Sequence, residues 1–219
     1  SDKVIPIMES FRYGQQNEVP EIIFSNGTPS KDFFPVEVYQ KLSEKAIKDC
    51  GKELFGYQNV QGLTSLREAL ADYLEKDDIF VESEDIIITS GTQQSLDIVV
   101  KAFGCHPVKT IVISNPTYPN AINFLGDVCN IKTMDIENDG WNMEEFEELI
   151  KKEKIHMVYI ISNFQNPTGI VWSDEKKKRL IQLAEEYDFY IIEDDCFCEF
   201  YYDDNKVYSI KSMDKNVEE

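Results

Sequence analysis

From residue 85 onward, short apolar runs alternate with amphipathic stretches of helical length. The apolar runs, which predict strands, lie at 86–89, 110–114, 131–136, 157–162 and 189–193. The stretches with apolar residues at helical spacing lie at 93–103, 119–125, 143–151 and 174–187. Strands that alternate with helices are typical of a parallel sheet with crossover connections. We therefore expect a doubly wound, mainly parallel α/β sheet in three layers.

The chain before residue 85 follows a different pattern. Residues 1–34 show no sustained periodicity, and their Gly and Pro positions are typical of an extended arm with turns. Pro35 can open a helix that Gly51 closes. We expect residues 1–50 to form an N-terminal arm and a first helix.

Helix-start signals support the remaining assignments. Thr64 precedes apolar residues at helical spacing, and Ser173 precedes the last long amphipathic stretch. Asn142 and Glu145 form a start similar to a capping box. Residues 51–219 are expected to form the main domain.

The charge balance limits the partners of the chain. Its 41 acidic and 22 basic residues give a formal net charge of −19. Such an excess repels phosphates, so we expect no nucleic acid contact by this segment. No apolar run is long enough to span a bilayer, and we expect a cytoplasmic protein. The charged runs 144–148 and 176–179 are interpreted as solvated helix faces.

Residue types that commonly bind metal ions are sparse. Of the five cysteines, Cys196 and Cys198 are separated by one residue, where zinc and redox motifs usually have two. The two histidines, His106 and His156, are interpreted as structural. We therefore expect no metal site and a reduced protein.

Ligands of open parallel sheets bind beyond the carboxyl ends of the strands, so the loops that follow the strands are candidates for a site. The loop 89–94 follows the first predicted strand and opens a helix. Its free amides and the helix dipole favour a phosphate, Gly91 allows close approach, and Thr92 adds a hydroxyl. The same residues also suit plain capping of the helix.

Two further loops combine proline with one distinctive side chain. In 114–119, two prolines fix the backbone around Tyr118, whose ring can stack on a planar heteroaromatic ligand or simply pack against the protein. In 163–169, Asn166 precedes a proline and is confined to extended geometry, so its amide can donate to a phenolic or phosphate oxygen. The Asn-Pro-Thr-Gly segment could equally be a turn.

The fourth loop begins with three successive carboxylates, Glu193, Asp194 and Asp195, at the end of an apolar strand. Like charges so close together are costly unless a cation compensates them. A protonated pyridine nitrogen or a metal ion would serve, and the metal ion lacks histidine partners.

In this order and on these elements, the four loops resemble pyridoxal-5'-phosphate (PLP) dependent enzymes of fold type I, specifically the class I and II aminotransferase family. The resemblance covers nearly the whole chain. It includes Gly27-Thr28-Pro29 and the segment from Tyr57 through Gly62 to Leu66-Arg67. It implies the large domain of that fold, incomplete at its C-terminal side, with PLP as cofactor and a homodimer as the working form.

The resemblance also implies roles for single residues. Those expected to contact the cofactor are Gly91, Thr92 and Gln93 at the phosphate, Tyr118 on the ring face, Asn166 at the ring hydroxyl and Asp194 at the ring nitrogen. The Asp194 carboxylate would keep the ring protonated and able to accept electrons. Tyr57 would reach the phosphate in the partner subunit. Gly27 would lie near the carboxylate of the substrate, an amino acid or a related small amine.

Two departures from the family affect the expected function. The family commonly has a tyrosine two or three residues after Asp194, where this chain has Cys196 and Phe197. The chain also stops at Glu219, before the strand that leads to the family's Schiff-base lysine, so no catalytic residue is assigned. Lys211 is interpreted as a surface lysine. Without the family's lysine, the polypeptide alone should be inactive.

Two functions follow from the resemblance. The one we favour is the PLP-binding, effector-sensing domain of a MocR-type, GntR-family transcription regulator, whose DNA-binding winged helix would belong to another segment. The alternative is part of a free-standing aminotransferase that moves an amino group between an amino acid and a 2-oxo acid. A dinucleotide-binding domain is disfavoured because no Gly-x-Gly-x-x-Gly follows the first predicted strand.

Overall fold

The computed structural model describes residues 30–103, 109–202 and 204–214. The chain divides into two compact units, Ser1–Gln58 and Asn59–Glu219. Within the described ranges, no helix has the length and apolar character needed to cross a membrane.

The described residues of the first unit, 30–58, form one long helix flanked by two short helical turns. The elements are η1 (Lys31–Phe33), α2 (Val36–Cys50) and η2 (Gly51–Phe55). Pro35 is the N-cap of α2, and Gly51 ends the helix with φ 56°, a conformation that glycine adopts without steric cost. The predicted helix between Pro35 and Gly51 is therefore confirmed. None of the described residues of this unit is buried.

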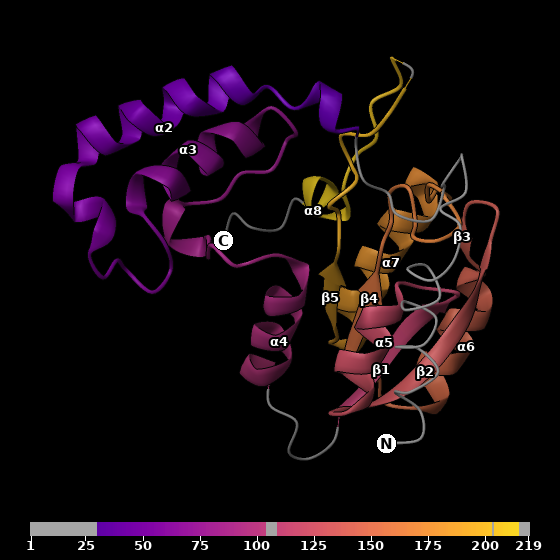
Figure 1. Cartoon of the computed structure of the whole chain (residues 1–219). Helices are drawn as coiled ribbons and strands as arrows, with labels where there is room; N and C mark the ends of the chain where they lie inside the picture. The colour runs from indigo at the N-terminus through magenta and orange to yellow at the C-terminus, as the bar shows by residue number, and fades with distance from the viewer. Residues whose placement is uncertain (1–29, 104–108, 203, 215–219) are drawn as a thin grey trace, which may run out of the picture. The chain divides into compact units, whose positions relative to one another are not determined.

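Among the described residues, a five-stranded sheet forms the centre of the second unit (Figure 1). Its strands are β1 (Lys109–Asn115), β2 (Cys129–Glu137), β3 (Gly140–Trp141), β4 (Met157–Ile160) and β5 (Tyr190–Glu193), in the spatial order β3-β2-β1-β4-β5. All neighbouring pairs are parallel except β2 with β3. The predicted doubly wound, mainly parallel sheet is confirmed.

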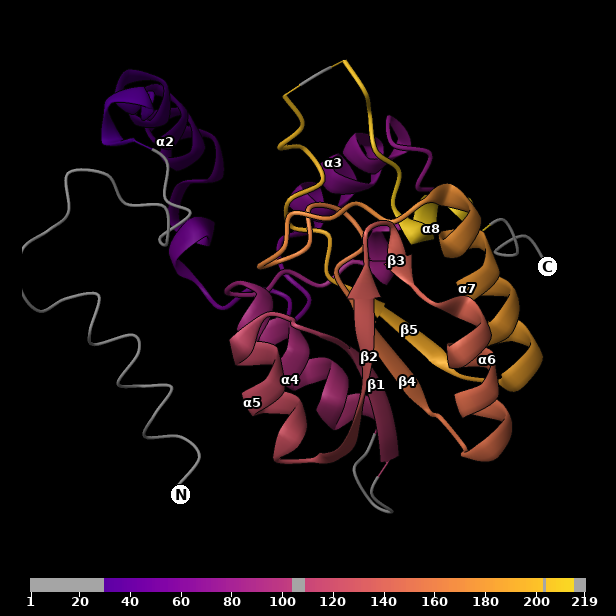
Figure 2. The same cartoon turned by 90° about the vertical axis from the view of Figure 1, so that its right-hand side faces the viewer.

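Helices cover both faces of the sheet and complete three layers (Figure 2). The described helices of this unit are α3 (Thr64–Glu75), α4 (Thr92–Phe103), α5 (Pro119–Gly126), α6 (Met143–Lys152), α7 (Asp174–Tyr187) and α8 (Ile210–Met213), with the turn η3 (Ser83–Asp85). In the central strand, Ile113 belongs to the same apolar cluster as Leu96 of α4, and its neighbour Val112 belongs to the other cluster, with Leu180 of α7. Both faces of β1 are apolar because both are covered, as is usual for parallel strands.

The predicted strand 86–89 is wrong. These residues pair with no described strand, and the N–H of Ile88 donates to Gln61 O (2.8 Å) outside any ladder. A strand exists only where a neighbouring strand supplies its hydrogen-bond partners, which an apolar run alone does not reveal. The short strand β3 was not predicted, because two residues are too few to show a period.

The helix-start signals are confirmed at two of three positions. Asn142 and Ser173 are the N-caps of α6 and α7, and each accepts a hydrogen bond from the first turn of its helix. Thr64 is not a cap, because the N-cap of α3 is Leu63 and Thr64 is the first helical residue. The Thr64 hydroxyl instead accepts a hydrogen bond from Arg67 Nη2 (3.3 Å).

The two charged runs differ in burial. The glutamates in 144–148 are exposed or half-buried, which agrees with a solvated face. The same interpretation of 176–179 is wrong at Lys177, whose side chain is 1% exposed. Its Nζ donates to Asn163 Oδ1 (2.7 Å) and to Tyr208 O (2.6 Å). Hydrogen bonds to protein oxygens replace the water that this ammonium group loses.

Candidate cofactor site

The predicted cofactor residues of the second unit lie at one edge of the sheet. Figures 1 and 2 show that α4 and α5 begin at the end where the parallel strands β1, β4 and β5 finish. Gly91, Thr92 and Gln93 are at the start of α4, Tyr118 precedes α5, Asn166 follows β4, and Asp194 follows β5. The fold therefore brings these loops to the carboxyl edge of the sheet, where doubly wound proteins bind ligands.

The turn before α4 presents unused backbone donors. Gly91 has φ +89°, and a Cβ placed on it would meet no heavy atom within 4 Å. Within the described part of the chain, the N–H groups of Gly91, Thr92 and Gln93 bond to no protein acceptor. The N–H of Ser90 is occupied by Gln94 Oε1 (2.5 Å). Three free donors beside open space suit an anion.

Tyr118 is fixed at the start of α5. It is the N-cap of this helix, follows a cis peptide bond between Asn115 and Pro116, and packs half-buried against the apolar cluster of α4 and α5. Its hydroxyl accepts a hydrogen bond from Asn120 Nδ2 (2.8 Å). Apolar contacts therefore hold the Tyr118 ring, and a hydrogen bond holds its hydroxyl.

The loop after β4 is fixed around Asn166. The neighbouring Gln165 is 1% exposed, and its Nε2 donates to Pro116 O (2.8 Å). Its Oε1 accepts from the N–H of Thr168 (2.9 Å). Asn166 is half-buried, precedes a cis bond to Pro167, and its amide bonds to no other described residue. The Asn166 amide is thus available to a ligand in a loop whose neighbours are held.

Asp194 accepts a hydrogen bond that the sequence did not predict. Its Oδ2 accepts from the hydroxyl of Tyr159 (2.8 Å), a fully buried residue of β4. Burial, and then the Asp194 carboxylate, raise the pKa of Tyr159, so the hydroxyl stays protonated and donates. Tyr118 lies close enough to add to this shift. Tyr159 of β4 therefore lies between the loop after β5 and the loop before α5, bonded to Asp194 and close to Tyr118.

The two other carboxylates of the fourth loop bond to protein donors. Glu193 accepts from the hydroxyl of Ser162 (2.6 Å) and from the N–H of Ile210 (2.7 Å). Asp195 Oδ1 accepts from Asn163 Nδ2 (2.8 Å). Burial, and then the nearby Glu193, raise the pKa of Asp195 to about 6. These two groups are therefore accounted for without a bound cation.

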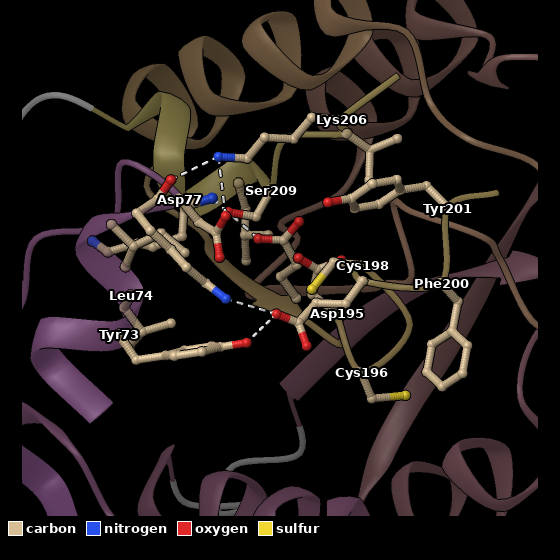
Figure 3. Close-up of a pocket in the computed structure, with 17 residues that line it drawn as sticks. Tyr73, Leu74, Asp77, Asp195, Cys196, Cys198, Phe200, Tyr201, Lys206 and Ser209 are labelled. Atoms are coloured by element: carbon tan, nitrogen blue, oxygen red, sulfur yellow. Dashed lines mark hydrogen bonds and ion pairs between the residues drawn. The ribbon is translucent and has the colours of Figure 1, made fainter. Parts of the chain in front are cut away.

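A cavity of about 690 Å³ lies beside β5 (Figure 3). It is lined by Ile191, Glu193 and Asp195 and, opposite them, by the end of α3. Asp194 does not line it, because successive residues of an extended chain alternate between faces. None of the six predicted cofactor residues of the second unit lines this cavity, so it is a separate feature.

The charged groups around this cavity bond to one another. Lys76 Nζ lies 2.9 Å from a carboxylate oxygen of Glu199, which also accepts a hydrogen bond from the Tyr73 hydroxyl. Lys206 Nζ lies 3.0 Å from Asp77 Oδ1. These contacts join the end of α3 to the segment after β5.

Cys196, Cys198 and the described histidine have structural environments. Burial, and then Asp194, raise the pKa of Cys196 to about 12, and burial with Asp195 raises that of Cys198 to about 11. Neither thiol ionises near neutral pH. His156 Nδ1 accepts the N–H of Thr110 (3.1 Å), and burial lowers its pKa, which confirms the structural interpretation. His106 lies outside the described residues.

Three other residues were named from the sequence. Gly27 is outside the described residues. Tyr57 belongs to the first unit, where its side chain is fully exposed. Lys211 is on α8, is exposed, and its Nζ lies 3.5 Å from Asp214 Oδ2, which confirms it as a surface lysine.

The sequence is similar both to enzymes and to regulators. The aromatic-amino-acid aminotransferase 1 of Thermococcus litoralis is 32% identical over 220 residues, which are 97% of this chain and 52% of that protein. The helix-turn-helix transcriptional regulator YcxD of Bacillus subtilis is 32% identical over 176 residues, which are 80% of this chain and 39% of that protein. The chain thus spans about half the length, or less, of these curated relatives.

The fold is similar to that of solved aminotransferases. The kynurenine aminotransferase of Pyrococcus horikoshii superposes with a TM-score of 0.85 at 29% identity, over 99% of this chain and 55% of that one. The model of the family described as aminotransferase class I and II matches residues 21–218. Since this match covers most of the sequence, the chain belongs to the class I and II aminotransferases, a family that implies pyridoxal 5'-phosphate as the cofactor.

Proposed function

We propose that this chain binds pyridoxal 5'-phosphate at the carboxyl edge of its sheet. In this proposal, the N–H groups of Gly91, Thr92 and Gln93 hold the phosphate, and Tyr118 covers one face of the ring. The observation that carries the proposal is the turn of free donors at the start of α4, at the same edge of the sheet as the Asp194 carboxylate.

The residues present also suit the other polar positions of the cofactor. The free amide of Asn166 can donate to the ring hydroxyl oxygen. One oxygen of Asp194 is held by the Tyr159 hydroxyl. The carboxylate can accept a hydrogen bond from the protonated ring nitrogen and so favour the charged form of the ring. When bound, the cofactor supplies a ring that accepts electrons from the Cα of an amino acid. The protein's part is to orient that ring and to keep its nitrogen protonated.

We further propose that the domain senses an effector in a MocR-type, GntR-family transcription regulator. The similarity to a helix-turn-helix regulator supports this proposal. Phe197, at a position where the family commonly has a tyrosine, suits a domain that binds without fast turnover. The effector would be an amino acid or a related small amine. Another segment would contact DNA, since the net charge of −19 opposes contact by this one.

A free-standing aminotransferase is the second candidate. The match to an aromatic-amino-acid aminotransferase favours it, because that match covers 97% of this chain. The whole protein would then move an amino group from an amino acid to a 2-oxo acid, and Gly27 would lie near the substrate carboxylate. Both candidates use the same cofactor site.

Either function is proposed to require a homodimer. Tyr57 would then extend to the phosphate that the partner subunit binds. Two observations support this: the Tyr57 side chain is fully exposed, and the first unit buries none of its described residues.

Titration with pyridoxamine 5'-phosphate tests the cofactor site, because this form cannot make an imine with surface lysines. We expect calorimetric binding to the whole chain and a loss of about tenfold or more in affinity for Asp194→Asn, which removes a charge-assisted bond. Asp195→Asn is the matched control, since its side chain bonds to Asn163, and its affinity should stay within about twofold. Equal losses in both variants, or none in either, would reject the assignment of Asp194.

The gene itself distinguishes the regulator from the enzyme. Sequencing upstream of the codon for Ser1 should find a basic winged-helix sequence in frame if the domain belongs to a regulator. A start codon within a few residues would contradict the regulator and support the free-standing aminotransferase.

A further inference from the structure

Gln165 is a buried side chain that connects two loops of the candidate site. Its Nε2 donates to the carbonyl oxygen of Pro116 (2.8 Å), in the loop that carries Tyr118. Its Oε1 accepts from the N–H (2.9 Å) and the hydroxyl (2.5 Å) of Thr168, in the loop that carries Asn166. One amide group thus bonds to both loops at once, with its donor on one and its acceptor on the other.

The loop before α5 has no other polar bond to the loop after β4 among the described residues. Thr117 is buried, yet its hydroxyl has no partner there. Asn115 Nδ2 bonds to Asp135 Oδ1 (2.8 Å) on β2, which lies on the opposite side of β1 from β4. The bond from Gln165 to Pro116 is therefore the polar contact that fixes the separation of the two loops.

This separation matters because each loop supplies a different contact to a planar ligand. Tyr118 lies two residues after Pro116, and Asn166 directly follows Gln165. A ring held by both must meet the aromatic face of Tyr118 and the amide of Asn166 together. Displacements of about 1 Å are enough to weaken such paired contacts.

We propose that Gln165 is a positioning residue for the cofactor ring, and that it acts by holding the Pro116 carbonyl and so the placement of Tyr118 relative to Asn166. This inference rests on the proposed cofactor site. Gln165 acts through protein groups and not by touching the cofactor, because its side chain is 1% exposed and is bonded at both ends. Glutamine suits the position because it offers a donor and an acceptor on one planar group.

A double-mutant cycle on the whole chain tests the role, with pyridoxamine 5'-phosphate as the probe. Gln165→Glu keeps the acceptor for Thr168 but loses the donor to Pro116, so affinity should fall by about fivefold to twentyfold. The control Thr168→Val removes a hydroxyl bond inside one loop, and its affinity should stay within about twofold. In a Tyr118→Ala background, Gln165→Glu should cost less than about twofold, because the residue it positions is gone.

A change of pH gives a second readout of the bond to the Pro116 carbonyl. A protonated glutamic acid has nearly the shape of glutamine and can donate to the Pro116 carbonyl. The affinity deficit of Gln165→Glu, measured against the unsubstituted chain at each pH, should therefore narrow between about pH 8 and about pH 5.5. A deficit that is the same at both pH values would contradict the inference.

The outcomes separate this inference from the cofactor site. A full effect of Gln165→Glu that persists in the Tyr118→Ala background would overturn the positioning role, and so would wild-type affinity in Tyr118→Ala. Failure of the unsubstituted chain to bind the probe would instead reject the cofactor site. If thermal unfolding shows that Gln165→Glu does not fold, Gln165→Met completes the same cycle, with the same loss expected and the same coupling to Tyr118.

Discussion

Lys177 shows how a charged side chain is accommodated beneath the carboxyl edge of the sheet. Its Nζ bonds to Asn163 Oδ1 (2.7 Å) and Tyr208 O (2.6 Å), and the charges of Glu193 and Asp195 favour its protonated form. Burial has the larger effect and lowers its pKa. The ammonium group thus joins the loop after β4 to the segment before α8.

Replacement of this lysine should destabilise the fold. Lys177→Met keeps an unbranched side chain of similar length but leaves the buried Asn163 Oδ1 without its donor and removes one of the two donors to Tyr208 O, so we expect a loss of about 1–3 kcal/mol in the free energy of unfolding. Lys178→Met, at an exposed position of the same helix, is the control and should change it by less than about 0.5 kcal/mol. Chemical denaturation measures both, and equal values for the two variants would contradict a structural role of Lys177.

Single residues differ in how far the sequence could predict them. The loops of the candidate site could be predicted because each follows a predicted strand, where parallel sheets place ligands, and the roles proposed for their residues come from the resemblance to the family. Tyr159 and Gln165 were not found, because their roles depend on partners 35 and 49 positions away. A tyrosine in an apolar run and a glutamine beside a turn carry no local sign of such partners. The sequence did contain a local sign of the burial of Lys177, because Leu180, three residues later, lies on the same side of the helix and is buried.

At the scale of elements, periodicity predicted the long helices and four strands because those elements have one or two covered faces. The prediction of a strand at 86–89 failed because an apolar pattern does not show whether a neighbouring strand is present to form hydrogen bonds with it. The hairpin of β2 and β3 was not predicted, although two of its residues, Gly140 and Trp141, stabilise its conformation. Gly140 has φ +125°, and Trp141 is fully buried, with its Nε1 bonded to Ser114 Oγ (2.9 Å).

Gly140→Ala should disrupt this hairpin. A Cβ at residue 140 would lie 2.7 Å from Trp172 Cδ2 and 3.1 Å from Lys176 Cδ, and the positive φ adds backbone strain. We expect a loss of about 2–4 kcal/mol in the free energy of unfolding. Gly126→Ala is the control, because its Cβ would meet only Ile131 Cδ1, at 3.6 Å, and it should change stability by less than about 1 kcal/mol. Thermal or urea unfolding of the two variants checks the difference, and similar losses would disprove the steric explanation.

At the scale of the whole molecule, the two units differ in how they gain stability. The second unit has two apolar clusters, one on each face of its sheet. The first unit buries none of its described residues, although α2 carries exposed apolar side chains such as Tyr39, Leu42 and Ile47. An isolated amphipathic helix is marginally stable in water, so α2 needs a surface that covers its apolar side. A second copy of the chain is the surface that the proposed homodimer supplies.

A charge on the apolar side of α2 should therefore weaken self-association. We expect Leu42→Glu to raise the dimer dissociation constant by about tenfold or more in sedimentation equilibrium, because a carboxylate would be buried at the interface. Lys45→Glu, at an exposed position of the same helix, is the control for electrostatic repulsion between copies. This substitution makes the net charge more negative than Leu42→Glu does. If both variants weaken association equally, repulsion between acidic chains explains the result. If neither variant weakens association, α2 is not in the interface. That result would also contradict the proposal that Tyr57 extends to the phosphate site of the partner subunit.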